Sequence, residues 1–212
     1  MTTTRLILLR HGETVWNREN RIQGHLDSPL NDTGIAQAEA LAQRLAGETF
    51  DALYSSDLGR ARETAERIAR RTGHAIVFDA GMRERNLGIL QALTRAEAQA
   101  IHPEIYSRYR TLGPDYALPG GESAQQFVTR VVTSFTCIAN QFPGKTVVAM
   151  THGGALDAMY RHVTGSPLRG ARMTPLLNAS HNLFHYTHGL WSLQVWGDVG
   201  HLQSEAIDDL RD

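Results

Sequence analysis

The chain has 212 residues, enough for one sizeable hydrophobic core, and we expect a single domain over residues 1–212. Its 21 Lys and Arg balance 22 Asp and Glu to a formal net charge of −1 at pH 7, so the composition predicts neither nucleic acid nor an anionic membrane surface as a partner. Cys137 is the only cysteine, which excludes an intrachain disulfide and leaves a cysteine-based metal site short of ligands.

The chain begins with a short polar segment and then a short apolar run. This run, residues 6–9, ends at Arg10. It is far shorter than the roughly 20 residues of a membrane-spanning helix, and shorter than the apolar part of a secretory signal. We therefore expect a cytoplasmic protein with no membrane partner.

Strand and helix patterns alternate along the chain. Apolar, β-prone runs predict strands at residues 5–10, 52–55, 75–78 and 145–150, then a more variable pair at 180–187 and 191–196. Apolar residues at helical spacing predict helices at residues 33–46, 58–72, 94–110, 123–142 and 153–163. This alternation is typical of a parallel sheet with helices on both faces. We predict a three-layer α/β/α sandwich with a mostly parallel central sheet and an antiparallel edge strand.

The periodicity loosens between residues 79 and 121, where Pro103, Pro114, Pro119 and the pair Gly120-Gly121 interrupt it. Long irregular insertions often close over a site or select its substrate. We expect this segment to be a lid or a substrate-selecting insertion, and the sequence does not determine whether it closes over the substrate.

The last two expected strands carry large apolar side chains, including Trp191, Leu193 and Trp196. These side chains either pack on the edge of the sheet or join a partner. The sequence does not determine the oligomeric state, and a homodimer is among the states compatible with it.

Two of the expected strands end in a His-Gly junction. The first strand runs into Arg10-His11-Gly12, and the strand at 145–150 runs into Thr151-His152-Gly153-Gly154. Open α/β sheets bind their ligands at the carboxyl ends of the strands. One such junction alone is typical of a strand followed by a turn glycine, but two would bring two imidazoles to one rim.

The helix expected at residues 58–72 begins like an anion site. Ser55-Ser56-Asp57 offers cap residues, and Arg60 and Arg62 fall in the first turns. Helix amino termini attract anions through free N–H groups, and guanidinium groups bind phosphate oxygens in pairs. The pattern indicates a site for a dianion. The alternative for Arg62 is a solvated helix face on which it pairs with a nearby Glu.

Together these segments resemble the histidine phosphatase superfamily, which has the phosphoglycerate mutase-like fold. The resemblance runs through nearly the whole chain and is strongest to the second bacterial type, which is similar to a broad-specificity phosphatase. The motifs that carry it are Arg-His-Gly-Glu-Thr at Arg10–Thr14, Trp16-Asn17 with Arg21-Ile22-Gln23-Gly24 and Asp27-Ser28-Pro29-Leu30, Ser-x-Leu-x-Arg-Ala-x-x-Thr at Ser56–Thr64, Arg-Glu-Arg-x-x-Gly at Arg83–Gly88, and His-Gly-Gly at His152–Gly154.

The resemblance implies a catalytic set. His11 would accept the phosphoryl group, Arg10, Arg60 and His152 would bind its oxygens, and Glu84 would donate a proton. The implied substrate contacts around this set are Gly12, Glu13, Thr14, Asn17, Arg21, Gln23, Gly24, Arg62, Gly153 and Gly154. Close approach of the backbone to the phosphate is the reason expected for Gly12.

Phosphomonoester chemistry gives these residues distinct tasks. A neutral nitrogen of His11 attacks in line, while the other nitrogen donates to a backbone carbonyl and so holds the tautomer. Two arginines and a protonated His152 stabilise charge on the equatorial oxygens. Glu84 protonates the leaving oxygen and later deprotonates water, for which burial or the phosphate charge must raise its pKa. The structural alternative for Glu84 is a salt bridge to Arg83 or Arg85.

Other enzyme classes fit less well. We expect no metal site, because His181 and His185 share one face of a strand while His188 does not, and no carboxylate or cysteine completes a ligand set. The chain has no Gly-x-Ser-x-Gly elbow and no P-loop motif. A non-catalytic phosphate-sensing module is a further alternative, which the presence of His11 and Glu84 disfavours.

We therefore predict a metal-independent phosphomonoesterase that acts on a small phosphorylated metabolite and needs no cofactor. The chief alternative is a cofactor-dependent phosphoglycerate mutase, for which 2,3-bisphosphoglycerate would be the phosphoryl donor. Resembling mutases have a longer segment between the counterparts of Glu84 and His152, which favours the phosphatase. Many relatives have Glu-Gly where this chain has Leu90-Gln91-Ala92, so the roles of Gln91 and Ala92, and the substrate, stay open.

Overall fold

A computed structural model describes residues 2–168 and 174–202, so residues 1, 169–173 and 203–212 of the expected domain lie outside the described residues. The sheet has six strands in the order β3-β2-β4-β1-β5-β6. Their bounds are β1 Thr4–Arg10, β2 Ala52–Ser55, β3 Ile76–Phe78, β4 Thr146–Thr151, β5 His181–Thr187 and β6 Leu190–Asp198. The strands β3, β2, β4 and β1 pair in parallel, whereas β5 is antiparallel to β1 and β6 to β5. The mostly parallel sheet with an antiparallel edge is thus confirmed, and a hairpin forms that edge.

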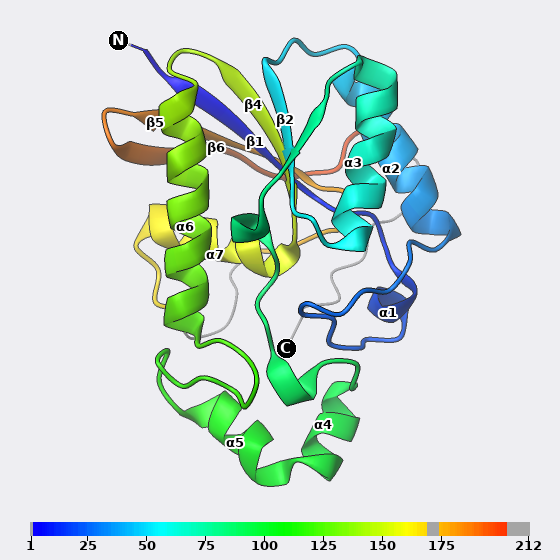
Figure 1. Ribbon diagram of the computed structural model, residues 1–212, viewed down its shortest axis with the longest axis vertical. Helices are drawn as coiled ribbons and strands as arrows, with labels where there is room; N and C mark the ends of the chain where they lie inside the picture. The colour runs from blue at the N-terminus through cyan, green and yellow to red at the C-terminus, as the bar shows by residue number, and fades with distance from the viewer. Residues whose placement is uncertain (1, 169–173, 203–212) are drawn as a thin grey trace.

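Helices cover both faces of the sheet. Figure 1 shows α2 and α3 on one side and α6 on the other, while α4 and α5 stand apart below the sheet. The bounds are α1 Val15–Arg18, α2 Asp32–Leu45, α3 Gly59–Thr72, α4 Arg95–Ile101, α5 Pro103–Thr111, α6 Ala124–Gln141 and α7 Gly153–Thr164, with 3₁₀ turns η1 at Ala80–Met82 and η2 at Gly88–Leu90. The three-layer arrangement expected from the sequence is confirmed.

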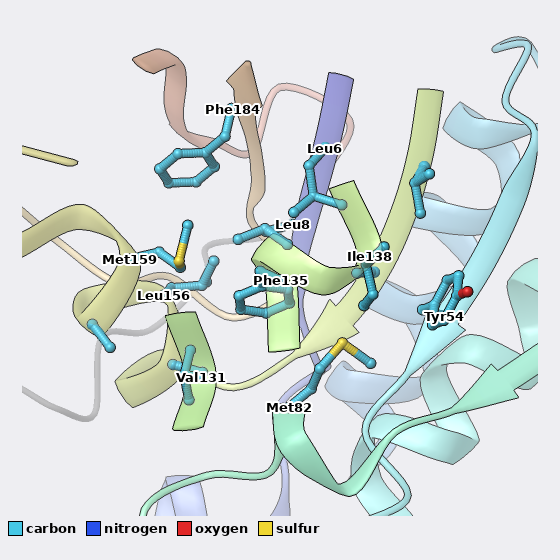
Figure 2. Packing of buried hydrophobic residues seen from close by; sticks show 14 of the residues in the cluster. Leu6, Leu8, Tyr54, Met82, Val131, Phe135, Ile138, Leu156, Met159 and Phe184 are labelled. Atoms are coloured by element: carbon cyan, nitrogen blue, oxygen red, sulfur yellow. The ribbon is translucent and has the colours of Figure 1, made fainter. Parts of the chain in front are cut away.

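The alternation of side chains along β1 divides the core in two. Leu6 and Leu8 pack with α6 and α7 in the cluster drawn in Figure 2, whereas Ile7 and Leu9 pack with α2 and α3. All four side chains are buried because successive residues of a strand point to opposite faces and helices cover both of them. An unbroken apolar run is therefore the pattern of this central strand.

The single helix expected at residues 94–110 is wrong, because the structure has two helices there. Thr94 caps α4 with a capping box, α4 ends at Ile101, and α5 begins at Pro103. Proline has no N–H to continue a helix and disfavours helical conformation at the residue before it, here His102. As the first residue of α5 the same proline is well tolerated.

The segment 79–121 is more regular than the interrupted periodicity suggests. Besides α4 and α5 it holds both 3₁₀ turns, and it has a small core of its own around Leu90, Ala98 and Leu118. Tyr106 and Tyr109 of α5 pack against that core. The insertion therefore presents a packed wall next to the carboxyl ends of the parallel strands.

The large side chains of the edge hairpin pack inward. Trp191 and Trp196 lie against the cluster of Figure 2, and their indole N–H groups donate to Thr136 Oγ1 and to the carbonyl oxygen of Pro175, each at 3.2 Å. Cys137 is exposed on α6, away from the buried face of the helix. Within residues 2–168 and 174–202, no helix has the length and apolar character to cross a membrane.

Candidate active site

The two His-Gly junctions meet because their strands are neighbours. β1 and β4 pair in parallel with Arg10 opposite Thr151, so the residue after each strand lies at the same edge of the sheet. The backbone N–H of His11 donates to the carbonyl oxygen of Thr151 at 3.1 Å. The rings of His11 and His152 have centroids 5.3 Å apart and are tilted by 59°. Two imidazoles therefore share one rim, as the sequence predicts.

The hydrogen bonds of His11 identify its tautomer. Nδ1 lies 2.7 Å from the carbonyl oxygen of Gly12, which can only accept, so the proton is on Nδ1. Nε2 accepts a hydrogen bond from Nε of Arg60 at 3.3 Å. Burial lowers the pKa of His11 well below its usual range, and the charges of Arg60 and Arg10 lower it further. The expected donation to a backbone carbonyl is confirmed, and the electron pair of the unprotonated Nε2 accepts the hydrogen bond from Arg60.

Two fully buried arginines stand beside that nitrogen. Arg10 and Arg60 are each 1% exposed, which is rare for a guanidinium and requires partners that compensate its charge. Nη1 of Arg10 donates to the carbonyl oxygen of Leu176. Nη2 of Arg60 donates to the carbonyl oxygen of Gly24 at 2.8 Å. Both cations are thereby anchored by backbone groups, and Nε of Arg60 points to Nε2 of His11.

Asp27 holds Arg60 and the start of α3. Its carboxylate accepts from Nη1 of Arg60 at 2.9 Å and from the backbone N–H of Gly59 at 2.7 Å. The local cap expected from Ser55-Ser56-Asp57 is wrong, since the N-cap position is Leu58 and its side chain makes no cap hydrogen bond. Asp57 is instead paired with Arg83, at 2.7 and 2.5 Å. An acceptor from a distant loop thus replaces the local one.

Glu84 reaches the site from the segment after η1. Its two carboxylate oxygens accept from the backbone N–H groups of Arg85, at 2.7 Å, and of Gly154, at 2.8 Å. A Cβ on Gly154 would overlap that carboxylate, so the glycine allows Glu84 to hold this position. The structural alternative for Glu84 was a salt bridge to Arg83 or Arg85. In the part of the chain that the structure describes, Glu84 forms no such salt bridge.

Two side chains hold the backbone of Glu84, and a third orients one of them. Arg130 of α6 donates to the carbonyl oxygens of Arg83 and Glu84, at 3.1 and 3.3 Å. Nε2 of His25 donates to the same carbonyl of Glu84 at 2.8 Å. Glu122 accepts from Nη2 of Arg130 at 2.6 Å and so orients the guanidinium. The peptide that carries Glu84 is therefore fixed from two other loops and a helix.

His152 is buried next to the two arginines. Burial lowers its pKa well below the usual range, with further lowering from Arg60, His11 and Arg10. The expected protonated imidazole belongs to a site that holds a phosphoryl group, and it stays a prediction. Nε2 lies 2.8 Å from the hydroxyl of Ser56, whereas Nδ1 is buried and has no hydrogen-bond partner among the described residues. His152 has no exposed surface and is not among the residues that line the smaller of the two chambers described next.

Two adjoining chambers open at this edge of the sheet. The smaller has a volume of about 140 Å³ and contains the edge of His11 together with Arg10 and Arg60. The larger has a volume of about 640 Å³ and extends between α5, α6 and α7. Glu84 and Tyr109 belong to the walls of both chambers, so they stand where the two meet.

Several of the expected substrate contacts line the smaller chamber. They are Asn17, Arg21, Gln23 and Gly24. The carboxamide oxygen of Gln23 is buried, and no group within residues 2–168 and 174–202 donates a hydrogen bond to it. Arg21 is drawn toward α4, since it pairs with Glu97 at 2.6 Å and donates to the carbonyl oxygen of Ala92 at 2.9 Å. Gln23 is the better placed of these to bind a polar ligand.

Gly12, Glu13 and Thr14, which were expected to contact the substrate, make contacts within the fold. A Cβ on Gly12 would overlap the carbonyl oxygen of Gly34, so the approach of α2 by itself accounts for glycine there. Glu13 accepts from Nδ2 of Asn31 at 2.7 Å, and Thr14 is the N-cap of α1. None of the three belongs to the walls described for the smaller chamber.

Arg62 and Gly153 also differ from expectation. Arg62 is exposed and lies over the ring of Phe78, 4.7 Å from its centroid, outside both chambers. Arg62 therefore lies on a solvated helix face, as in the alternative given for it, but its partner is an aromatic ring and not a glutamate. Gly153 is the buried first residue of α7, and it is Gly154 whose N–H makes the polar contact in this structure.

Gln91 and Ala92, which stand where many relatives have Glu-Gly, make hydrogen bonds that hold neighbouring loops. The side-chain oxygen of Gln91 accepts from the backbone N–H of His25 at 2.6 Å. The backbone N–H of Ala92 donates to the carbonyl oxygen of Ile22 at 2.7 Å. Both hold the 21–25 loop against the insertion.

Among the described residues, no three His, Cys, Asp or Glu side chains cluster as a metal site would require.

Sequence reasoning did not assign roles to Asp27, His25, Glu122 and Arg130. Asp27 lies inside a quoted motif, which was a usable signal for a polar role. Glu122 follows the Gly120-Gly121 pair and precedes the cap of α6. Nothing in the local pattern connects Arg130 with Glu84, because their contact joins residues that are far apart in the chain.

Comparisons with known proteins agree with this geometry. The family model of the histidine phosphatase superfamily (branch 1) matches residues 6–199. Phosphoglycerate mutase-like protein 4 of Arabidopsis thaliana is 41% identical over 206 residues, covering 95% of this chain and 88% of that protein. The metal-independent phosphoserine phosphatase of the same plant is 41% identical over 204 residues, covering 95% and 84%. The solved structure of Bacillus stearothermophilus YhfR is similar with a TM-score of 0.86 and 33% identity, covering 93% of this chain and 98% of that one.

Proposed function

Because this chain belongs to the histidine phosphatase superfamily, we propose that it hydrolyses a small-molecule phosphomonoester through a phosphohistidine at His11. The observation that carries the proposal is the state of His11. Its Nδ1 proton is held by the carbonyl oxygen of Gly12, and its unprotonated Nε2 faces Arg60 in the smaller chamber. A neutral imidazole held in one tautomer is a competent nucleophile.

In the first step Nε2 of His11 attacks phosphorus in line. The N–P bond forms as the bond from phosphorus to the leaving oxygen breaks, and the electron pair of that bond stays on the leaving oxygen. The carboxyl group of Glu84 gives this oxygen a proton, so an alcohol departs. The position of Glu84 where the chambers meet supports this role, because the phosphoryl group and the alcohol would lie on either side of it.

In the second step water attacks phosphohistidine. The Glu84 carboxylate takes a proton from the water, the new O–P bond forms, and the N–P bond breaks to return neutral His11 and release inorganic phosphate. No proton is gained or lost by the enzyme over the cycle. The contact with Ser56 supports a role for His152 as a hydrogen-bond donor. When the Ser56 hydroxyl donates to Nε2 of His152, the ring proton of His152 lies on Nδ1.

Electrostatic stabilisation carries most of the proposed catalysis. Monoester hydrolysis can require acceleration up to about 10²¹-fold, whereas general acid catalysis supplies about 10²- to 10⁴-fold. Arg10 and Arg60 are buried, where charge interactions are stronger than in water, and their backbone anchors hold them in place before substrate arrives.

Phosphoglycerate mutase activity is the second candidate, supported by a relative named phosphoglycerate mutase-like. A mutase must protect phosphohistidine from water while its intermediate turns. The segment between Glu84 and His152 is shorter than in the mutases that this chain resembles, which favours hydrolysis.

One preparation tests these alternatives. The protein is exposed briefly to 4-nitrophenyl phosphate and quenched in alkali, and mass spectrometry then locates acid-labile phosphate, with His11→Asn as the control. Phosphate release from a metabolite panel and conversion of 3- to 2-phosphoglycerate are measured on the same material, before and after dialysis against EDTA.

We expect labelled His11, phosphate release and full activity after EDTA. Conversion with negligible phosphate release would establish the mutase instead. An absence of both labelling and turnover would indicate a non-catalytic phosphate-binding module.

A further inference from the structure

The turn that precedes β5 contacts both residues at the end of β1. It comprises residues 177–180, and the backbone N–H of Ser180 donates to the carbonyl oxygen of Leu177 at 3.2 Å. The carbonyl oxygen of Ser180 accepts from the backbone N–H of Arg10, also at 3.2 Å. Just before the turn, the carbonyl oxygen of Leu176 accepts from the guanidinium of Arg10. One short segment therefore holds Arg10 by its main chain and by its side chain.

The same turn holds His11 by its carbonyl oxygen. The backbone N–H of Ala179 donates to that oxygen at 3.2 Å, and Nδ2 of Asn178 donates to it at 3.3 Å. The carboxamide of Asn178 must present its nitrogen here, because a carbonyl oxygen can only accept. Asn178 and Ala179 have no exposed surface, so bulk water does not compete for these two hydrogen bonds.

The peptide between His11 and Gly12 is thereby fixed at both of its edges. Its oxygen is the acceptor just described, and its N–H donates to Oγ1 of Thr64 at 3.2 Å. The next carbonyl oxygen, that of Gly12, lies 2.7 Å from Nδ1 of His11 and holds the imidazole in one tautomer. The orientation of this peptide therefore sets the direction in which Nε2 of His11 points.

The turn keeps two features that are unfavourable for folding. Ala179 has a φ of 54°, a left-handed conformation that glycine and asparagine adopt more readily. Oδ1 of Asn178 is buried, and no group among the described residues donates a hydrogen bond to it. Strained backbone and unpaired buried polar atoms both destabilise a native state, and such strain gathers at functional sites. The two features occur together where the turn meets His11.

We infer that Asn178 is a positioning residue for the transfer of the phosphoryl group to His11, and that the turn at residues 177–180 presents it. Asn178 lines neither chamber, so it acts through the carbonyl oxygen of His11 and has no contact with the reacting atoms. The bonds made and broken are those of the proposed first step. The inference thus rests on the proposed function.

Asn178→Leu removes the donor and keeps a similar shape. We expect kcat/KM to fall about 10- to 100-fold, as for a displacement of the nucleophile near 1 Å. The loss should be equal on 4-nitrophenyl phosphate and on an alkyl phosphate, because the substitution moves His11 and leaves the proton donor in place. Asn178→Ala, which adds no bulk, repeats the test if N178L does not fold.

Two further measurements on N178L separate positioning from a general structural role. Arg10 and Arg60 keep their backbone anchors, so the inhibition constant of inorganic phosphate should change less than about threefold. The unpaired oxygen is lost together with the donor, so the midpoint of urea unfolding should stay near its wild-type value.

Asn178→Asp tests the hydrogen bond itself. A protonated carboxyl group can donate to the carbonyl oxygen of His11, whereas a carboxylate can only accept. Burial raises the pKa of a carboxyl group, so a large share of N178D should be protonated at pH 5.5. At that pH we expect kcat/KM of N178D to exceed that of N178L or N178A at least about fivefold, and its ratio to the wild type to fall as the carboxyl group ionises.

Asn182→Leu is the matched control. Asn182 of β5 is also buried, and its Nδ2 donates at 3.1 Å to the carbonyl oxygen of Leu8, on the same strand as Arg10. Its Oδ1 accepts from the backbone N–H of Gly197 at 2.7 Å, so both ends of this carboxamide are paired. N182L should therefore lower the urea midpoint more than N178L does and lower kcat/KM less than about threefold. Asn182→Ser is the milder form of the same control.

The outcomes separate this inference from the function on which it rests. Wild-type kcat/KM in N178L or N178A would overturn the inference while labelled His11 upheld the phosphatase. Equal losses of kcat/KM in the Asn178 and Asn182 variants would indicate a general structural role and overturn it too. So would an N178D protein no more active at pH 5.5 than N178L or N178A. Unlabelled His11 in the wild type would overturn the proposed function and the inference together.

Discussion

Arg130 donates a hydrogen bond to the carbonyl oxygen of Glu84 at 3.3 Å, across 46 residues of sequence. The same guanidinium binds the carbonyl oxygen of Arg83 and is held by Glu122. Its position makes Arg130 a positioning residue for the proton donor, with no contact to the reacting atoms.

Replacing Arg130 by Met should therefore impair substrates that need a proton donor. We expect kcat/KM to fall about 10- to 100-fold on an alkyl phosphate, because a displacement near 1 Å can cost that much. The loss on an aryl phosphate should be smaller, and Arg130→Lys should recover part of it. Arg67→Met, which breaks ion pairs on α3 outside both chambers, is the control for general destabilisation. Equal losses on both substrates would contradict a positioning role.

Glu84→Gln tests the proton donor itself. The amide can still accept from a backbone N–H but cannot protonate an alkoxide, so we expect a loss of about 10²- to 10⁴-fold on an alkyl phosphate. An aryl phosphate has a weakly basic leaving oxygen and should lose less than about tenfold. Steady-state kinetics on the two esters provides the comparison, with Glu63→Gln on α3 as a control. A loss independent of the leaving group would rule out the role.

Asp27→Asn should weaken phosphate binding without regard to the leaving group. The substitution removes the charge that pairs with Arg60 at 2.9 Å while keeping an acceptor for the start of α3. We expect a fall in kcat/KM of about tenfold on alkyl and aryl esters alike, and a stability loss of about 1 kcal/mol. Asp51→Asn breaks a similar pair with Lys145 outside the two chambers and should leave the kinetics unchanged. Wild-type kcat/KM in the Asp27 variant would contradict this account.

His181 should make stability fall in mild acid. Burial lowers its pKa to about 4, with Arg44 and His201 adding to the effect and Glu48 and Asp198 opposing it. The unfolded chain takes up a proton below about pH 6.5 that the folded chain refuses, so stability declines from pH 6.5 toward 4 at about 1.4 kcal/mol per unit. Above pH 6.5 this group has no effect.

Urea unfolding at pH 7.5 and 5.0 measures the decline. We expect the free energy of unfolding to drop about 2 kcal/mol less in His181→Gln than in the wild type. His188→Gln, at an exposed position, should drop as the wild type does. An identical drop in all three proteins would show that His181 does not drive the pH dependence.

Local patterns predicted the strands, most of the helices and the residues at the ends of the strands. The apolar run before Arg10 and that before Thr151 predict two buried parallel strands, and adjacent strands of that kind necessarily deliver their following residues to one edge. His11 and His152 therefore meet as expected, and His11 donates to a backbone carbonyl as expected. The one helix that failed did so at Pro103, where backbone chemistry overrode apolar spacing.

The sequence by itself determined the sheet, the order of its elements and the identity of the motif residues, because these depend on local periodicity and residue type. Only the tertiary structure decided that Asp27 holds Arg60, that Arg130 holds Glu84 and that Gly12 makes room for α2. It also buries His152 near Arg60, His11 and Arg10, and this burial lowers the pKa of its imidazole. Such contacts join residues dozens of positions apart, and the pKa of an imidazole depends on the water and charge that folding removes or brings near.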